Sequence, residues 1–399
     1  KTIPNNEAYA ILKNQIPDIS SNSTLRTIAS DSIETKKNVV LITIESLSSE
    51  YMEMYGYTFN ITPFLDSLAL KSLNFSNLYA TGNRTVRGLE AMTLSIPPTP
   101  GESVVKRVDN KDKFSTASIF TSKGYQVKYL YGGDAYFDNM RDFFSGNSYD
   151  IVDKTSFKPE EITFANIWGV CDGDMANKAI KTMNEEAKKG KPFFNHWMTV
   201  SNHRPFTYPD GKIEIPSDSQ TREGGVKYTD FALRQFFKMA EKQPWFKNTV
   251  FVVISDHCSY SAGRTEINLK NHHIPAFIYN LKDEIPREVK KLSSQIDIFP
   301  TLFGYLNWSY ESNLFGKDIR KMQPKDERAF ISNHRKLGLL KDNHLVILNN
   351  HKGHNFYQTN PNNKQLISKK TDSLFLEETV SYYQTAFDLF KNNSLKIQK

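Results

Sequence analysis

Two apolar stretches of the sequence each end in side chains that can bind a metal ion. The stretch 38–44 is followed by Glu45, and the stretch 249–254 is followed by Ser255, Asp256 and His257. A carboxylate at the end of a buried strand loses hydration and needs a partner, of which a cation is the simplest. Carboxylates with an imidazole form a mixed oxygen and nitrogen set that suits Mn²⁺, Mg²⁺ or Zn²⁺. Taken alone, Glu45 has an equally ordinary explanation as a helix-capping carboxylate.

The segment 80–90 adds a candidate nucleophile. Glycines flank a run that holds Arg84, Thr85 and Arg87 just where a helix is expected to begin. The start of a helix presents free backbone N–H groups and favours anions. A threonine hydroxyl beside a metal ion would lose its proton easily and attack phosphorus, while Arg84 or Arg87 held the phosphoryl oxygens. Composition alone fits a glycine-rich turn with surface arginines equally well.

Histidines follow or precede several of the same stretches. His203 comes just after the stretch 192–200, and His273 lies directly before Ile274-Pro275. A histidine at the end of a strand can bind a phosphate oxygen or protonate a leaving alkoxide. We expect His203 and His273 to converge near Thr85, although a single histidine more often has a structural role. His196 lies within a predicted strand and is expected to be buried.

Alternating strands and helices must position these groups. Apolar runs of strand length alternate with amphipathic stretches over about 270 residues, which favours a mainly parallel central sheet with helices on both faces. In open sheets of this kind, ligands bind beyond the carboxyl ends of the strands. The expected strands are 38–44, 125–131, 192–200, 249–254 and 273–279, and the expected helices begin at Thr62-Pro63 or cover 175–188, 225–243 and 293–306.

The pattern changes near residue 325. Short strands are expected at 328–332, 338–340 and 344–348, followed by a closing helix at 371–392. We therefore predict three parts: a polar lead-in at 1–36, an α/β catalytic domain at 37–324, and a C-terminal subdomain with a small antiparallel sheet at 325–399.

Composition narrows the class of protein. The 399 residues are 39% hydrophobic and 24% charged, which is typical of a globular chain and not of a disordered one. The net charge of +7 comes mostly from scattered lysines, so we expect no nucleic-acid partner. Cys171 and Cys258 form no CxxC motif and are expected to be two unrelated buried thiols. No stretch has the roughly 18 apolar residues of a membrane span.

Several of these motifs occur in one order that carries a resemblance. The set comprises 38–46, Tyr55-Gly56-Tyr57, Thr62-Pro63, Gly82-Asn83-Arg84-Thr85, 201–206 and 255–257. Together they resemble the extracellular catalytic domain of the lipoteichoic acid synthase and phosphoglycerol transferase family, within the sulfatase and alkaline phosphatase superfamily. The resemblance implies an alkaline phosphatase-like fold. It also implies that Glu45, Thr85, Asp256 and His257 bind one divalent ion. Because this set has one nitrogen, no thiolate and a majority of oxygen ligands, Mn²⁺ is favoured, with Zn²⁺ or Mg²⁺ as alternatives.

The resemblance further implies the reaction and its location. Thr85 would take up the phosphoryl group, and His203 would contact substrate near the leaving or entering oxygen. The donor would be phosphatidylglycerol or phosphatidylethanolamine and the acceptor a glycan or lipid. The chain would work on the outer face of the cytoplasmic membrane (in the periplasm of a Gram-negative cell), held by an N-terminal anchor outside the printed sequence.

One departure from the family concerns the headgroup. Lipoteichoic acid synthases place a Trp-Asn-Arg group after the Gly-Asp that follows a strand, whereas here Gly133-Asp134 leads to Asp138 and Asn139. These two residues are expected to bind a different headgroup or acceptor. Thr85 is followed by Val86-Arg87-Gly88, without the C/S-x-P-x-R motif of sulfatases that mature to formylglycine. The leading hypothesis is a transferase; a phosphodiesterase or phosphatase and a non-catalytic binding domain are the alternatives.

Overall fold

A computed structural model describes residues 2–260 and 266–397. Its centre is an eight-stranded sheet with the strand order β12-β3-β11-β10-β2-β9-β5-β6. Only β11 runs against the other strands, so the sheet is mixed but mainly parallel, as the sequence predicts. The strands are β2 (Asn38–Ile44), β3 (Ser72–Phe75), β5 (Gln126–Tyr131), β6 (Asp150–Val152), β9 (Phe193–Met198), β10 (Thr249–Ser255), β11 (Ala276–Tyr279) and β12 (Arg287–Val289).

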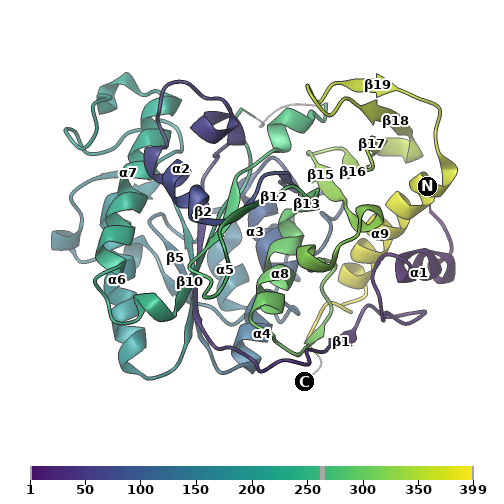
Figure 1. The fold of residues 1–399 in the computed structure, drawn as a ribbon, viewed down its shortest axis with the longest axis horizontal. Coiled ribbons are helices and arrows are strands. Elements are labelled where there is room, and N and C mark those ends of the chain that lie inside the picture. Colours follow the sequence, from purple (N-terminus) through teal and green to yellow (C-terminus); the bar gives the residue numbers. More distant parts are fainter. Residues whose placement is uncertain (1, 261–265, 398–399) are drawn as a thin grey trace.

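Helices cover both faces of this sheet (Figure 1). One face is covered by α2 (Pro63–Leu70), α6 (Asp172–Lys188) and α7 (Arg222–Ala240), whose apolar side chains form one buried cluster with alternate residues of β2 and β10. The other face is covered by α3 (Thr85–Leu94), α4 (Thr116–Ser122), α5 (Met140–Ser145) and α8 (Ile298–Tyr305). Because β2 is buried along its whole length, it reads in the sequence as a continuous apolar run.

The C-terminal region forms a separate antiparallel sheet, as predicted. Its five strands lie in chain order: β15 (Ala329–Ser332), β16 (Leu337–Lys341), β17 (His344–Leu348), β18 (His354–Thr359) and β19 (Leu366–Ser368). The closing helix α9 (Ser373–Lys391) packs against it, with Asp372 accepting hydrogen bonds from the free N–H groups of Leu374 and Phe375.

The N-terminal segment is more ordered than its polar composition suggests. Helix α1 (Asn5–Lys13) packs against α9 (Figure 1), and the Gln384 side chain exchanges hydrogen bonds with the backbone of Ile3. Strand β1 (Arg26–Ile28) pairs with β14 (Tyr310–Ser312). The buried side of α1 is only Ala8, Tyr9 and Leu12, a stripe too short to stand out in a polar sequence.

Two predicted boundaries differ from the structure. The helix expected at 293–306 begins only at Ile298, because Ser293 and Ser294 form a short strand, β13, beside β4 (Leu78–Tyr79). The strand expected at 273–279 begins at Ala276, since Pro275 has no N–H to donate to the sheet. Cys171 and Cys258 are both buried and are not joined in a disulfide, as expected.

The main hydrophobic core does not stop at residue 325. Phe330, Leu339 and Tyr383 of the C-terminal region belong to the same buried cluster as Phe120 and Phe299 of the α/β region. The three-part division of the chain stays a prediction. Within the described residues, no helix is long and apolar enough to cross a membrane.

Candidate active site

The carboxyl ends of four neighbouring strands bring the predicted site residues to one edge of the sheet. Along that edge, β10 leads to Asp256 and His257, β2 to Glu45, β9 to His203, and β5 to the segment holding Asp138. Strands β10 and β2 pair in register up to Ser255 and Ile44, so the residues that follow them are neighbours. The topology thereby assembles groups that are more than 200 positions apart in the chain.

Glu45, Asp256 and His257 form a compact buried cluster. One ligand atom from each lies within 4.8 Å of the other two. His257 Nε2 lies 3.5 Å from Glu45 Oε1 and 3.5 Å from Asp256 Oδ2. The three side chains thus lie together, at distances short enough for one ion to contact all of them, and their role as metal ligands stays a prediction.

Thr85 joins this cluster from the start of α3. Arg84 is the residue before the helix and has extended backbone, so Thr85 is the first helical residue. Its hydroxyl donates a hydrogen bond to Glu45 Oε2 at 3.2 Å. The Thr85 oxygen therefore lies beside the carboxylate cluster and also at a helix end that favours anions.

The pKa values show that the cluster attracts positive charge. Burial would raise the pKa of Glu45, but the hydrogen bond and charge of His257 outweigh it and lower that pKa to about 2. Burial and the charge of Glu45 raise the pKa of Asp256 to about 7. Burial would lower the pKa of His257, yet Asp256 and Glu45 raise it to about 9.

The hydrogen bonds of Asp256 and His257 leave one ligand atom of each side chain facing the place where a metal ion would bind. Asp256 Oδ1 accepts from the backbone N–H groups of Ser46 and His257, while Asp256 Oδ2 is buried without a hydrogen-bond partner. His257 Nδ1 donates to the Cys258 carbonyl at 2.8 Å, so Nε2 is the nitrogen that faces the carboxylates and the one that would bind an ion after losing its proton. An unpartnered carboxylate oxygen beside such an imidazole nitrogen fits a divalent ion.

His203 lies at the rim of this cluster and is half-buried. Its Nδ1 pairs with the Arg204 carbonyl at 3.1 Å, which leaves Nε2 for a ligand. It is close enough to Glu45 for its charge to contribute to lowering the pKa of that carboxyl. Its ring contacts Trp168, with ring centroids 3.8 Å apart.

The two candidate arginines differ in environment. Arg87 is buried, and its guanidinium donates to Glu90 Oε1 at 2.8 Å and to the Thr99 carbonyl at 2.6 Å. Those contacts tie α3 to the following loop and leave Arg87 little capacity for phosphate. Arg84 is exposed beside Thr85. Of the pair, Arg84 is the one that remains suited to an anionic substrate.

His273 has contacts within the protein. Its Nε2 pairs with the Ser76 carbonyl at 2.8 Å, and its ring packs against Tyr55 and Tyr79. Burial is the main cause that lowers the pKa of His273 to about 4. These contacts describe a packed, neutral imidazole and do not support its predicted role as a phosphate ligand beside Thr85.

Asp138 and Asn139 lie in the segment that follows β5. Both have positive φ, and both contact the short helix at Val104–Lys106: Asp138 pairs with Lys106 at 3.3 Å, and Asn139 donates to the Val105 carbonyl at 3.1 Å. Burial is the main cause that raises the pKa of Tyr131, and the charges of Glu45 and Asp138 raise it further. Asp138 therefore lies close to the site. Its role in headgroup binding stays a prediction.

Two residues at the site were not identified from the sequence. Ser46 has a positive φ of 54° at the sharp turn after β2, and its hydroxyl donates to Glu45 Oε1 at 2.6 Å. Its position directly after Glu45 could have indicated this role. Trp168 comes from a hairpin far from any motif, and nothing local in the sequence indicates that it contacts His203.

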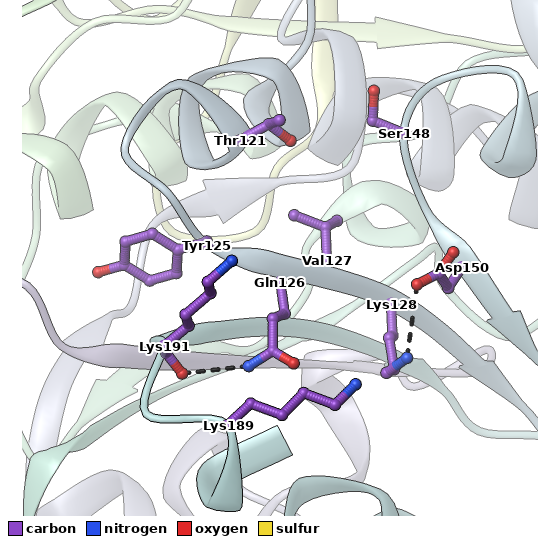
Figure 2. Close-up of a pocket in the computed structure, with 9 residues that line it drawn as sticks. All are labelled: Thr121, Tyr125, Gln126, Val127, Lys128, Ser148, Asp150, Lys189 and Lys191. Carbon is purple, nitrogen blue, oxygen red and sulfur yellow. Dashed lines mark hydrogen bonds and ion pairs between the residues drawn. The ribbon is translucent and has the colours of Figure 1, made fainter. Parts of the chain in front are cut away.

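A cavity of about 420 Å³ lies at the opposite end of the sheet. It is lined by the first residues of β5 and β6 and by two exposed lysines, Lys189 and Lys191 (Figure 2). Lys128 there is already paired with Asp150, and Gln126 donates to the Lys191 carbonyl. Since the candidate catalytic residues follow the carboxyl ends of the strands, this cavity is separate from them.

Known proteins share both the sequence pattern and the fold. The chain is 23% identical over 304 residues to phosphoglycerol transferase I of Xanthomonas euvesicatoria, covering 71% of this chain and 43% of that protein. It is 24% identical over 330 residues to lipoteichoic acid synthase 2 of Bacillus subtilis, covering 74% of this chain and 50% of that protein. The chain therefore spans about half the length of these relatives.

Solved structures give the same architecture. A protein of the alkaline phosphatase superfamily from Vibrio parahaemolyticus matches with a TM-score of 0.93 and 31% identity, covering 100% of this chain and 98% of that one. The lipoteichoic acid synthase LtaP of Listeria monocytogenes matches with a TM-score of 0.76 and 18% identity over the whole of both chains. The family model described as Sulfatase matches residues 37–308. The fold is thus alkaline phosphatase-like, and the chain belongs to the sulfatase family of enzymes.

Proposed function

We propose that this chain is a metal-dependent transferase that moves a phosphoglycerol or phosphoethanolamine group from a phospholipid to a glycan or lipid acceptor. The observation that carries the proposal is the position of the Thr85 hydroxyl, 3.2 Å from Glu45 Oε2 in the cluster with Asp256 and His257. The names of the relatives from Xanthomonas and Bacillus support the phosphoglycerol donor. Pure binding would not need a hydroxyl beside a metal site.

The metal site consists of Glu45, Asp256, His257 and the Thr85 hydroxyl. We propose Mn²⁺ as the ion, with Zn²⁺ or Mg²⁺ as alternatives, because oxygen ligands predominate and thiolates are absent from this set. A bound divalent ion would supply positive charge that favours ionisation of the Thr85 hydroxyl and stabilises negative charge on the phosphoryl oxygens.

The protein residues perform the transfer in two steps. Thr85 Oγ1 loses its proton to water and attacks the phosphorus of the donor; a Thr85 oxygen–phosphorus bond forms, and the bond from phosphorus to the diacylglycerol oxygen breaks. His203 Nε2 gives a proton to that leaving oxygen. In the second step an acceptor hydroxyl loses its proton to His203 and attacks the same phosphorus; the bond from phosphorus to Thr85 Oγ1 breaks, and the released oxygen takes a proton back from water. Arg84 binds the phosphoryl oxygens, and Asp138 and Asn139 contact the headgroup.

The donor and acceptor place the enzyme at a membrane surface. A phospholipid donor is available only where its headgroup meets water. We therefore propose that the chain works on the outer face of the cytoplasmic membrane and is held there by a segment outside the printed sequence. Exposed Arg84 would favour the negatively charged phosphate of the headgroup.

Intact-protein mass spectrometry tests the covalent step. The chain is loaded with Mn²⁺ and incubated separately with vesicles of phosphatidylglycerol and of phosphatidylethanolamine. We expect a mass increase that matches one headgroup phosphate on Thr85, its loss in Thr85→Ala, and its retention in Thr85→Ser. Full headgroup release by Thr85→Ala would refute the mechanism. Release of the free headgroup phosphate in the presence of glycan or lipid acceptors would identify a hydrolase.

A further inference from the structure

Trp168 lies between the two loops that border the candidate active site. It belongs to the hairpin of β7 (Ala165–Asn166) and β8 (Gly169–Val170) and is half-buried. One part of its indole contacts the His203 ring at a centroid distance of 3.8 Å. Another part meets the edge of Phe137, with centroids 5.2 Å apart and planes at 77°. His203 follows β9 and Phe137 follows β5, so the indole bridges the segments after two adjacent strands.

The hairpin is fixed to both of these segments. The Asn166 side chain accepts from the backbone N–H of Trp168 at 2.9 Å and donates to the Thr207 hydroxyl at 3.0 Å, in the loop that carries His203. On the other side, the Val170 N–H donates to the Gly132 carbonyl at 2.9 Å.

The close approach at Gly169 makes the second attachment rigid. Gly169 has a φ of 142°, and a Cβ there would lie 2.3 Å from the Gly132 carbonyl oxygen. Only a glycine fits this position without moving the strand end. The backbone that carries the indole is therefore fixed against the end of β5.

The contact with Trp168 restrains rotation of the His203 imidazole ring, which sets the direction of Nε2. With Nδ1 paired to the Arg204 carbonyl, the plane of the imidazole sets where Nε2 points. An indole packed against that imidazole opposes other ring orientations. A proton donor must lie within about 3 Å of the oxygen that it serves, so a small rotation of the ring is costly.

We propose that Trp168 is a positioning residue for His203, which holds Nε2 toward the leaving and entering oxygens of the phosphoryl group. The proposal rests on the transferase function given above. It assigns to the β7–β8 hairpin a part in the reaction that no motif in the sequence shows.

A double-mutant cycle tests the proposal. We compare Trp168→Ala, Trp168→Phe, His203→Ala and the Trp168→Ala/His203→Ala double variant for headgroup release from phosphatidylglycerol vesicles. Trp168→Ala should lower kcat at least about ten-fold with KM changed less than about three-fold. Trp168→Phe should restore most of the rate. In the His203→Ala background, Trp168→Ala should have no further effect, because both changes remove the same proton transfer.

The matched control is Ile167→Ala, since Ile167 is the exposed neighbour of Trp168 in the same hairpin. Its kcat should equal that of the wild type, and bound Mn²⁺ should be unchanged in all variants. Additive losses in the double variant, or equal losses in Ile167→Ala, would overturn the proposal.

Two further measurements test the role of Trp168 independently of the identity of the phospholipid donor. The ring current of the indole should shift the His203 Cε1–H resonance, and Trp168→Ala should remove that shift; an unchanged resonance would overturn the contact. The same cycle is run with bis(4-nitrophenyl) phosphate. If the wild type cleaves this diester but neither phospholipid, the proposed phospholipid donor is wrong. The double-mutant cycle on the diester still measures the coupling between Trp168 and His203.

Discussion

Gly88 in α3 faces the backbone of Asp256 so closely that a Cβ on Gly88 would lie 2.5 Å from the Asp256 carbonyl oxygen. Thr85 lies three residues earlier in the same helix, and Asp256 belongs to the buried cluster with Glu45 and His257. The absence of a side chain at Gly88 thus sets the distance between the helix that carries the proposed nucleophile and the loop that carries the proposed metal ligands.

Gly88→Ala should separate these two elements. The nearest atoms are backbone atoms and cannot rotate away, so α3 or the loop after β10 must shift. We expect a loss of about 1–3 kcal/mol in the free energy of unfolding and a fall in headgroup release of at least about ten-fold. Urea denaturation and the release assay measure both quantities. Gly353→Ala is the control, because its Cβ would meet nothing closer than 3.5 Å; equal effects of the two changes would contradict the argument.

Metal removal should distinguish Glu45 from Thr85. We expect chelation by EDTA to lower the melting temperature of the wild type and of Thr85→Ala by a few degrees, since an ion that binds only the folded state stabilises it by mass action. Glu45→Gln removes a carboxylate from the cluster and should show little change on chelation. Calorimetry with added Mn²⁺ measures the stabilisation. Strong Mn²⁺ binding by Glu45→Gln would contradict the assignment.

A pH-dependent loss of stability should come from Glu186, far from the active site. Burial is the main cause that raises the pKa of Glu186 to about 7. A carboxyl whose pKa is higher in the folded state binds its proton more tightly there, so stability falls as the pH rises from about 4.5 to 7. Glu186→Gln should therefore be more stable than the wild type at pH 8, by up to about 3 kcal/mol, with little difference at pH 4.5.

The contacts of Glu186 support a neutral side chain. Asn195 donates to Glu186 Oε2 at 2.6 Å, while Glu186 Oε1 and Asn195 Oδ1 are both buried without a hydrogen-bond partner. A proton on Glu186, or the amide of a glutamine, supplies a donor for such an acceptor. The exposed neighbour Glu185 serves as the control, and Glu185→Gln should leave the pH dependence unchanged. Equal pH profiles for wild type and Glu186→Gln would disprove the prediction.

The buried ion pair between Arg328 and Asp297 should be essential for stability. Both side chains are fully buried, with Nη1 2.6 Å from Oδ2. Arg328→Met leaves the Asp297 carboxylate without its counter-charge and should cost about 3–5 kcal/mol. Exposed Arg335 is the control, and Arg335→Met should change stability by less than about 0.5 kcal/mol. Chemical denaturation of both variants provides the comparison, and a near-neutral Arg328→Met would contradict the prediction.

Groups that follow buried strands could be predicted because strand burial and strand ends leave local marks in the sequence. The apolar run before Glu45 and the run before Asp256 indicated both the sheet and the place where their side chains meet. The helix at Thr85 was predicted from glycines and a hydroxyl near its start.

Other features depend on contacts between distant segments. Whether Arg87 faces solvent or Glu90 is decided by the loop at residues 99–101, which gives no local signal. His273, like His203, lies two residues before a proline, yet its ring packs against Tyr55 and Tyr79. The sequence does not predict helix α1, because its apolar side is short and is buried only by contact with α9, which lies far away in the sequence.

The packing of α1 against α9 has a consequence for synthesis on the ribosome. Residues of α1 leave the ribosome before those of α9, yet the surface that buries Tyr9 and Leu12 is made by α9. Strand β2 likewise lies between β9 and β10, which are translated more than 140 residues later. The segment that holds α1 therefore stays exposed to proteases and chaperones until α9 has left the exit tunnel, and the native core closes only then.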